Sequence, residues 1–199
     1  MTGHNIEAIV AGGSAGALGV LGSVLPVLPA GFSIPVAVVL HVLPGKPSYL
    51  AGVLAARCSL AVKEAEDKEL LTPGTIYLAP PNYHLLIEKD HSLSLSVDEP
   101  VHYSRPSIDV LFESAADAYG EALAAVLLTG ANKDGARGLA RIKAAGGTTV
   151  VQSPETALMR MMPDAALRLA QPDRVLPPEE IGSFLARLDR RSAEKVEAS

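Results

Sequence analysis

Residues 6–16 (IEAIVAGGSAG) place a short apolar run directly before a glycine-rich turn that carries a serine. The run over residues 6–11 predicts a strand buried inside a sheet, and the paired glycines after it predict a tight turn. Residues 15–25 continue with a glycine-rich helical pattern. A strand, a tight turn and a helix in this order form the repeating unit of an open parallel α/β sheet.

The rest of the chain repeats this alternation, with one change of texture in the middle. Residues 74–79, 83–88 and 93–97 are short alternating segments separated by turn residues, which favours antiparallel strands or a hairpin. The sequence therefore predicts an α/β fold with a mainly parallel, doubly wound (Rossmann-like) sheet and a small antiparallel hairpin insertion. It predicts a single domain over residues 1–189 and a charged, frayed tail over residues 190–199. The other predicted strands are residues 35–40, 60–63, 122–128 and 148–152, and the other predicted helices are residues 48–58, 107–119, 136–145, 163–169 and 178–188.

Composition and charge exclude several classes of function. Hydrophobic residues make up 48% of the chain and aromatic residues only 4%, which argues against disorder and against a base-stacking surface. The net charge of −5 and the lack of a Lys/Arg cluster argue against a nucleic-acid partner. A single cysteine, Cys58, leaves no internal disulfide and no multi-cysteine metal site.

The location of the protein is predicted from two further features. The first residues lack the basic region and apolar run of a secretory signal. The apolar stretch over residues 20–43 is interrupted by prolines, which disfavours a membrane helix. We therefore expect a cytoplasmic protein with no membrane insertion.

Three polar segments follow predicted strands, at residues 12–16, 41–45 and 129–135. Ligands of open α/β sheets bind beyond the carboxyl ends of the strands, so these segments predict the site. Ser14 stands in a G-x-S-x-G turn, where it is either a nucleophile or part of a phosphate-binding turn. The glycines here do not give G-x-G-x-x-G, and Gly45-Lys46 is followed by Pro47, so the dinucleotide and P-loop patterns are both missing.

His41 and Asp134 are the candidate partners of Ser14. A serine hydroxyl needs a base that titrates near neutral pH, and His41 ends the second predicted strand. Asp134 follows the strand at residues 122–128 and is able to orient the imidazole, although a turn aspartate or helix cap is the simpler interpretation. An EF-hand register fails at Gly130 and Arg141, where acids are required. Asp109 and Asp164 remain rival acids.

Together these stretches resemble the catalytic domain of the CheB family of chemotaxis protein-glutamate methylesterases. The matches occur in family order and cover nearly the whole chain. The matching segments are residues 11–18 (AGGSAGAL), 41–45 (HVLPG), 76–84 (IYLAPPNYH), 105–112 (RPSIDVLF), 127–135 (LLTGANKDG), 142–147 (IKAAGG), 151–154 (VQSP) and 162–166 (MPDAA).

The resemblance implies a parallel α/β domain with a catalytic triad of Ser14, His41 and Asp134. It also implies that backbone N–H groups near Ala15 and Ala131 stabilise an oxyanion, although the family often has methionine where this chain has Ala131. The implied substrates are methylated glutamates on the cytoplasmic helices of chemoreceptors, with deamidation of receptor glutamines as a further activity. No metal or organic cofactor is implied.

Typical family members carry a receiver domain before the first catalytic strand, and here that strand starts close to Met1. We therefore expect a stand-alone member or the catalytic part of a longer protein, with a separate protein as its regulator. Tyr83, His84 and the loop over residues 100–105 are predicted to form the surface that accepts the substrate. The alternatives are a serine hydrolase of another ester or amide and a non-catalytic binding module of the same fold.

Overall fold

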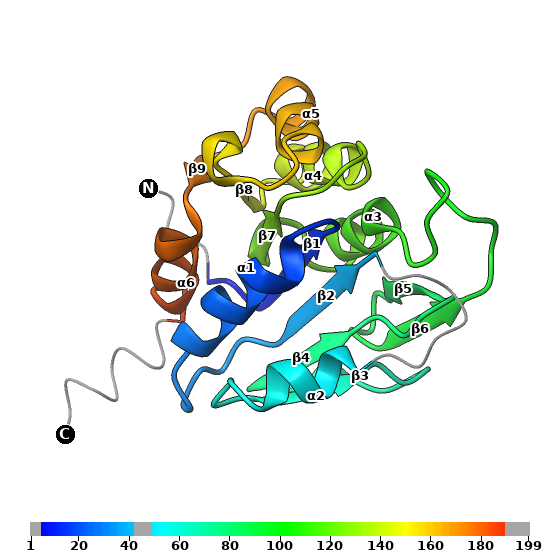
Figure 1. Cartoon of the computed structure of the whole chain (residues 1–199). Helices are drawn as coiled ribbons and strands as arrows, with labels where there is room; N and C mark the ends of the chain where they lie inside the picture. The colour runs from blue at the N-terminus through cyan, green and yellow to red at the C-terminus, as the bar shows by residue number, and fades with distance from the viewer. Residues whose placement is uncertain (1–4, 42–48, 190–199) are drawn as a thin grey trace.

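The computed structural model describes residues 5–41 and 49–189 of the chain. Seven strands form one sheet in the order β3-β4-β2-β1-β7-β8-β9, and every neighbouring pair is parallel (Figure 1). The prediction of a mainly parallel α/β sheet is therefore confirmed. The strands are β1 (Ala8–Gly13), β2 (Val36–Leu40), β3 (Ala61–Glu64), β4 (Thr75–Leu78), β7 (Leu123–Leu127), β8 (Thr148–Gln152) and β9 (Arg174–Leu176).

Helices cover both faces of the sheet, so the fold is doubly wound. Alternate residues of β1 enter two separate cores: Ala8 and Val10 face one, and Ile9 and Ala11 face the other. This explains why β1 reads as a continuous apolar run, because it is buried on both faces. One core is covered by α1 (Ala17–Val24), α2 (Leu50–Ala55) and α6 (Pro178–Ala186), and the other by α3 (Ile108–Tyr119), α4 (Ala136–Ala144) and α5 (Met161–Ala170). Short 3-10 helices lie at Leu25–Val27, Gly120–Ala122 and Pro154–Thr156.

The middle of the chain was predicted only in part. β5 (His84–Ile87) and β6 (Leu93–Ser96) form the expected antiparallel hairpin. The prediction that residues 74–79 belong with them was wrong, because β4 pairs in parallel with β2 and β3 inside the main sheet. Its apolar side chains are buried there, with Ile76 opposite Val36 in the register.

Two further points concern the extent of the elements. β9 was not predicted, since it has three residues and two of them are exposed. Three predicted regions lie outside the described residues. They are the tail over residues 190–199, residues 42–45 of the site segment predicted at residues 41–45, and residue 48 at the start of a predicted helix. None of the described helices combines the length and the apolar character that a membrane crossing requires.

Candidate functional site

The sheet brings the three candidate residues to one edge. β2, β1 and β7 are neighbours, and Gly13 pairs with Leu40 while Gly12 pairs with Leu127. Ser14 directly follows β1 and His41 directly follows β2. Asp134 follows β7 after a short loop. Their convergence follows from strand order, because parallel strands present their carboxyl ends on the same side.

The turn at Ser14 is held by its own backbone. The Ser14 N–H donates to Thr129 O at 2.9 Å, and Ser14 O accepts from Ala17 N at 2.9 Å. Gly16 caps α1 with a φ of 87°, a left-handed conformation that favours glycine. A Cβ at this position would also lie 2.8 Å from Leu158 Cβ, so glycine allows the neighbouring loop to pack against the turn. The Ser14 side chain is left half-buried.

Asp134 is fully buried and its two carboxylate oxygens are surrounded by donors. Although Asp134 precedes α4 in the sequence, its carboxylate lies at the N-terminus of α3. The first N–H groups of a helix have no partner inside the helix. Oδ2 accepts from His41 Nε2 at 2.8 Å and from Ile108 N at 2.8 Å, and Oδ1 accepts from Ser107 Oγ at 2.9 Å, Asp109 N at 3.0 Å and Gly135 N at 3.0 Å.

These donors determine the charge of Asp134. Burial alone would raise the pKa of the Asp134 carboxyl group, because a charge is poorly solvated inside the protein. The hydrogen bonds from His41 and from the N–H groups of Asp109 and Ile108 outweigh burial and hold the pKa below its usual value. Asp134 is therefore a carboxylate at neutral pH.

His41 is oriented by this carboxylate. Its Nε2 bonds to the Asp134 carboxylate, so in the neutral imidazole Nε2 is the donor and Nδ1 is the acceptor. Nδ1 faces Ser104 Oγ at 3.4 Å. Ser14 and His41 line the same cavity of about 570 Å³, together with Asn82, Asn132 and the loop over residues 100–106. Within the described part of the chain, Ser14 Oγ makes no hydrogen bond, so the structure shows the His41–Asp134 link of the predicted triad and no link from Ser14 to His41.

One isoleucine side chain packs α3 against the end of β1 and against the turn after Asp134. Ile108 begins α3, and its side chain lies where Cβ atoms of Gly12 and Gly135 would lie, at 2.3 Å and 2.7 Å from its Cγ2. Gly135 has a φ of 87° and caps α4. Glycine at both positions lets the end of β1 and the turn after Asp134 close onto α3, which is what delivers the helix N–H groups to the carboxylate.

Sequence reasoning missed a second set of partners. Ser107 is fully buried, its hydroxyl bonds to Asp134, and its N–H donates to His84 Nδ1 at 3.1 Å. His84 Nε2 in turn lies 3.2 Å from Glu99 O. The available signal was the position of Ser107 at the start of the helix predicted over residues 107–119, where serine is typical of an N-cap residue.

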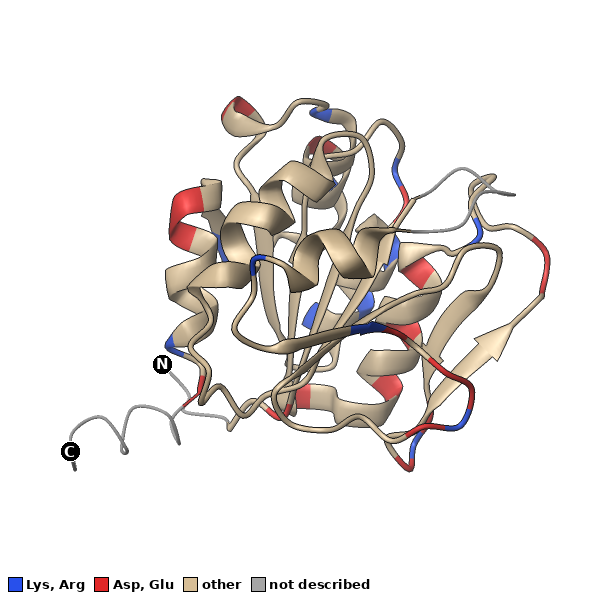
Figure 2. Cartoon of the chain, turned by 60° about the horizontal axis from the view of Figure 1, so that its bottom comes forward, with Lys and Arg blue, Asp and Glu red and all other residues tan. Residues whose placement is uncertain are grey.

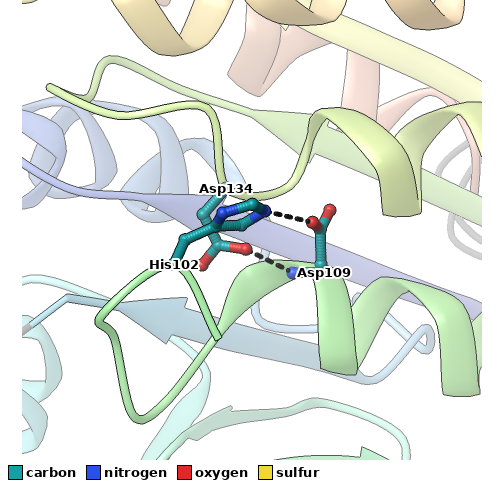
Figure 3. Close-up of side chains that lie close together, drawn as sticks. All are labelled: His102, Asp109 and Asp134. Atoms are coloured by element: carbon teal, nitrogen blue, oxygen red, sulfur yellow. Dashed lines mark hydrogen bonds and ion pairs between the residues drawn. The ribbon is translucent and has the colours of Figure 1, made fainter. Parts of the chain in front are cut away.

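His102 and Asp109 form a second pair beside the first. Figure 3 shows His102 on the loop before α3, with a ring nitrogen directed at Asp109. His102 Nε2 lies 3.3 Å from Asp109 Oδ2, an ion-pair distance without hydrogen-bond alignment. His102, Asp109 and Asp134 bring their ligand atoms within 4.8 Å of one another. This trio fits a metal ion poorly, because the donors around Asp134 already occupy its oxygens.

The remaining predicted residues are placed as follows. Asp164 lies on α5, 3.8 Å from Arg160, and does not join the site. The N–H groups of Ala15 and Ala131 make no hydrogen bond within the described residues, so both amides are available. His84 is buried and so cannot form a substrate surface, a correction to the prediction. Tyr83 is 41% exposed but does not line the cavity, whereas much of the predicted loop does.

The chain is similar to proteins of one family. A family model described as CheB methylesterase matches residues 9–185. A protein of Leptospira interrogans named as a protein-glutamate methylesterase/protein-glutamine glutaminase is 47% identical over 96% of this chain and 99% of its own length. A Carboxydothermus hydrogenoformans protein with the same activities in its name is 40% identical, over 90% of this chain but 54% of its own length.

A solved structure extends the likeness to three dimensions. The catalytic domain of Thermotoga maritima CheB methylesterase superposes with a TM-score of 0.87 at 34% identity, covering 92% of this chain and 98% of that one. The family match covers the described sheet except Ala8, the first residue of β1, and it includes the strand ends that precede Ser14, His41 and Asp134. This chain belongs to the CheB methylesterase family.

Proposed function

We propose that this CheB-family methylesterase hydrolyses glutamate methyl esters through a triad of Ser14, His41 and Asp134. The observation that carries the proposal is the bond between His41 Nε2 and the buried Asp134 carboxylate, with His41 and Ser14 lining one cavity. A carboxylate of this kind orients the imidazole and stabilises its protonated form. Relatives at 47% and 40% identity carry the methylesterase activity in their names, which supports the same chemistry here.

The first step forms an acyl-enzyme. Ser14 Oγ attacks the ester carbonyl while His41 Nδ1 takes the hydroxyl proton. The tetrahedral intermediate then collapses, the C–O bond to the methoxy group breaks, and His41 returns the proton so that methanol leaves. Water attacks the glutamyl ester by the same route and releases a glutamate carboxylate and free Ser14.

The N–H groups of Ala15 and Ala131 are proposed to hold the oxyanion. Ala15 directly follows Ser14 in the turn after β1, and Ala131 lies in the loop after β7 next to Asn132, which lines the same cavity as Ser14. Neither N–H has an acceptor among the described residues. Fixed N–H donors without partners are suited to negative charge that develops in the transition state. An alanine at 131 serves this role through its backbone, so the side chain that the family often has there is not required.

The proposed substrates are methylated chemoreceptors. Their methylated segments are cytoplasmic helices, so we propose that the enzyme acts in the cytoplasm and answers to a separate regulatory protein. The same acyl chemistry hydrolyses a glutamine amide with release of ammonia. The relatives' names include glutaminase activity, and we propose deamidation as a second reaction of this site.

Methanol release from a methylated receptor tests the function. The wild-type protein is expected to release methanol, and Ser14→Ala is expected to lose several orders of magnitude in kcat, up to about 10⁶ as in other serine triads. Circular dichroism of the variant checks that it is folded. A folded Ser14→Ala protein with near wild-type activity would rule out the proposed nucleophile.

A further inference from the structure

An open groove of about 920 Å³ adjoins the catalytic cavity and plays no part in the proposed chemistry. Three residues line both spaces, namely His102, Tyr103 and Asn132. The groove runs from these residues along α4 and α5. Any chain that enters the catalytic cavity from this side therefore passes over the groove.

Exposed apolar side chains line part of the groove. Ala136 and Ala165 contribute small side chains on the two helices, and Met161 and Leu169 are 55% and 58% exposed. Leucine and methionine side chains left this open about two turns apart on one helix form an apolar surface that gains free energy when another surface covers it.

The charges at this groove are positive. Lys133 and Arg168 line it and make no ion pair among the described residues, while Arg137 is neutralised by Glu113 at 2.6 Å. Asp109 is the one acid among the lining residues, and it is fully buried. The chain as a whole carries a net charge of −5, and Figure 2 shows both signs scattered over the face turned to the viewer. The groove therefore offers an acidic partner a local attraction despite the negative net charge of the chain.

A second groove carries charges of both signs and serves as a comparison. It has a volume of about 520 Å³ and lies at the edge strand β9 and at α6. Its cations, Arg174 and Arg187, are accompanied by Glu179 and Glu180. Its charges are therefore balanced and it does not adjoin Ser14, which makes it a matched control.

We propose that the groove between α4, α5 and the loop at Tyr103 docks an acidic amphipathic helix, with the apolar face of that helix on Met161 and Leu169 and its acids near Lys133 and Arg168. The proposal deepens the proposed function, on which it rests, by assigning the segment of the substrate that flanks the methylated glutamate to this groove. In a helix, side chains three and four residues apart share one face, so one face supplies both the ester and the docking contacts.

The test reverses the two unpaired cations. Lys133→Glu combined with Arg168→Glu is compared with Arg174→Glu combined with Arg187→Glu, so that both double variants change the net charge equally. The ratio of kcat/KM for methylated receptor to kcat/KM for p-nitrophenyl acetate is expected to fall roughly tenfold in the first and to stay within about twofold in the second. The loss should appear in KM, and salt should weaken receptor binding more in the wild type than in the first variant.

Binding measured without catalysis separates this proposal from the proposed function. In the Ser14→Ala background, the Kd for the receptor's cytoplasmic domain is expected to rise roughly tenfold on reversal of Lys133 and Arg168. That result supports the groove even if the wild type releases no methanol, in which case only the chemistry is wrong. An unchanged Kd and an unchanged kinetic ratio, or an equal loss in the control variant, would overturn the groove.

Discussion

Two histidine–aspartate pairs lie side by side at the edge of this sheet, and they differ in almost every respect that matters for catalysis. Asp134 and Asp109 are both fully buried, and each lies near a histidine ring nitrogen. Asp134 receives hydrogen bonds on both oxygens, including one from His41. Asp109 accepts one from Gly138 N at 2.7 Å on Oδ1, while its Oδ2 has no hydrogen-bond partner.

The pKa values of the two acids move in opposite directions as a result. Burial raises the pKa of Asp109; the Gly138 N–H opposes the rise and the neighbouring Asp134 carboxylate adds to it. At Asp134 burial acts in the same sense, but the hydrogen bonds win and the pKa falls. A buried aspartate beside a histidine is thus not enough to make a triad acid, since the donors around the carboxylate decide whether it is charged.

The largest expected effect comes from removing each acid in turn. Asp134→Asn is expected to lower kcat for methanol release by about 10⁴, because the amide cannot orient and stabilise the protonated imidazole in the same way. Asp109→Asn is expected to change kcat by less than about threefold. Both variants are checked by thermal unfolding, and an equal loss of kcat in two folded variants would erase the distinction between the pairs.

Ser107 sharpens the comparison, because it supplies a donor that Asp109 lacks. Ser107→Ala is expected to reduce the free energy of unfolding by about 1.5–3 kcal/mol, the usual value for a hydrogen bond to a charged group. The pKa of Asp134 should rise, so acid inactivation should begin at a higher pH than in the wild type. Ser107→Thr keeps the hydroxyl and is expected to restore the wild-type pH profile. A purely structural role would leave that profile unchanged in Ser107→Ala.

The smallest effect concerns stability against pH. Because the pKa of Asp109 is raised in the folded protein, its favourable contribution is present at low pH and is lost as the pH rises through the raised value. Asp134 behaves in the opposite way: its contribution is present at neutral pH and is lost as the pH falls through the lowered value. Urea unfolding from pH 4 to pH 8 should therefore show Asp109→Asn gaining stability relative to the wild type as the pH rises. A difference in the free energy of unfolding that stays constant from pH 4 to pH 8 would contradict the raised pKa of Asp109.

The sequence located the strand ends better than the contacts between them. Ser14 and His41 follow strongly apolar strands, so their shared edge was predictable from period and strand order. β4 was misassigned because a four-residue strand beside a hairpin has no local feature that distinguishes parallel from antiparallel pairing. The role of Ser107 and the burial of His84 depend on contacts between residues more than twenty positions apart, which no local pattern encodes.

The position of β1 in the sheet also governs when the site can form. β1 pairs on one side with β2, which follows it closely, and on the other with β7, which comes far later in the chain. β1 and β2, which precede Ser14 and His41, are able to pair early in folding. Pairing of β7, which leads to Asp134, must close a long loop, and contacts between distant residues form more slowly. The rate at which esterase activity recovers during refolding would therefore report when β7 and α3 dock. An activity assay would not detect the earlier collapse of the segment that carries Ser14 and His41.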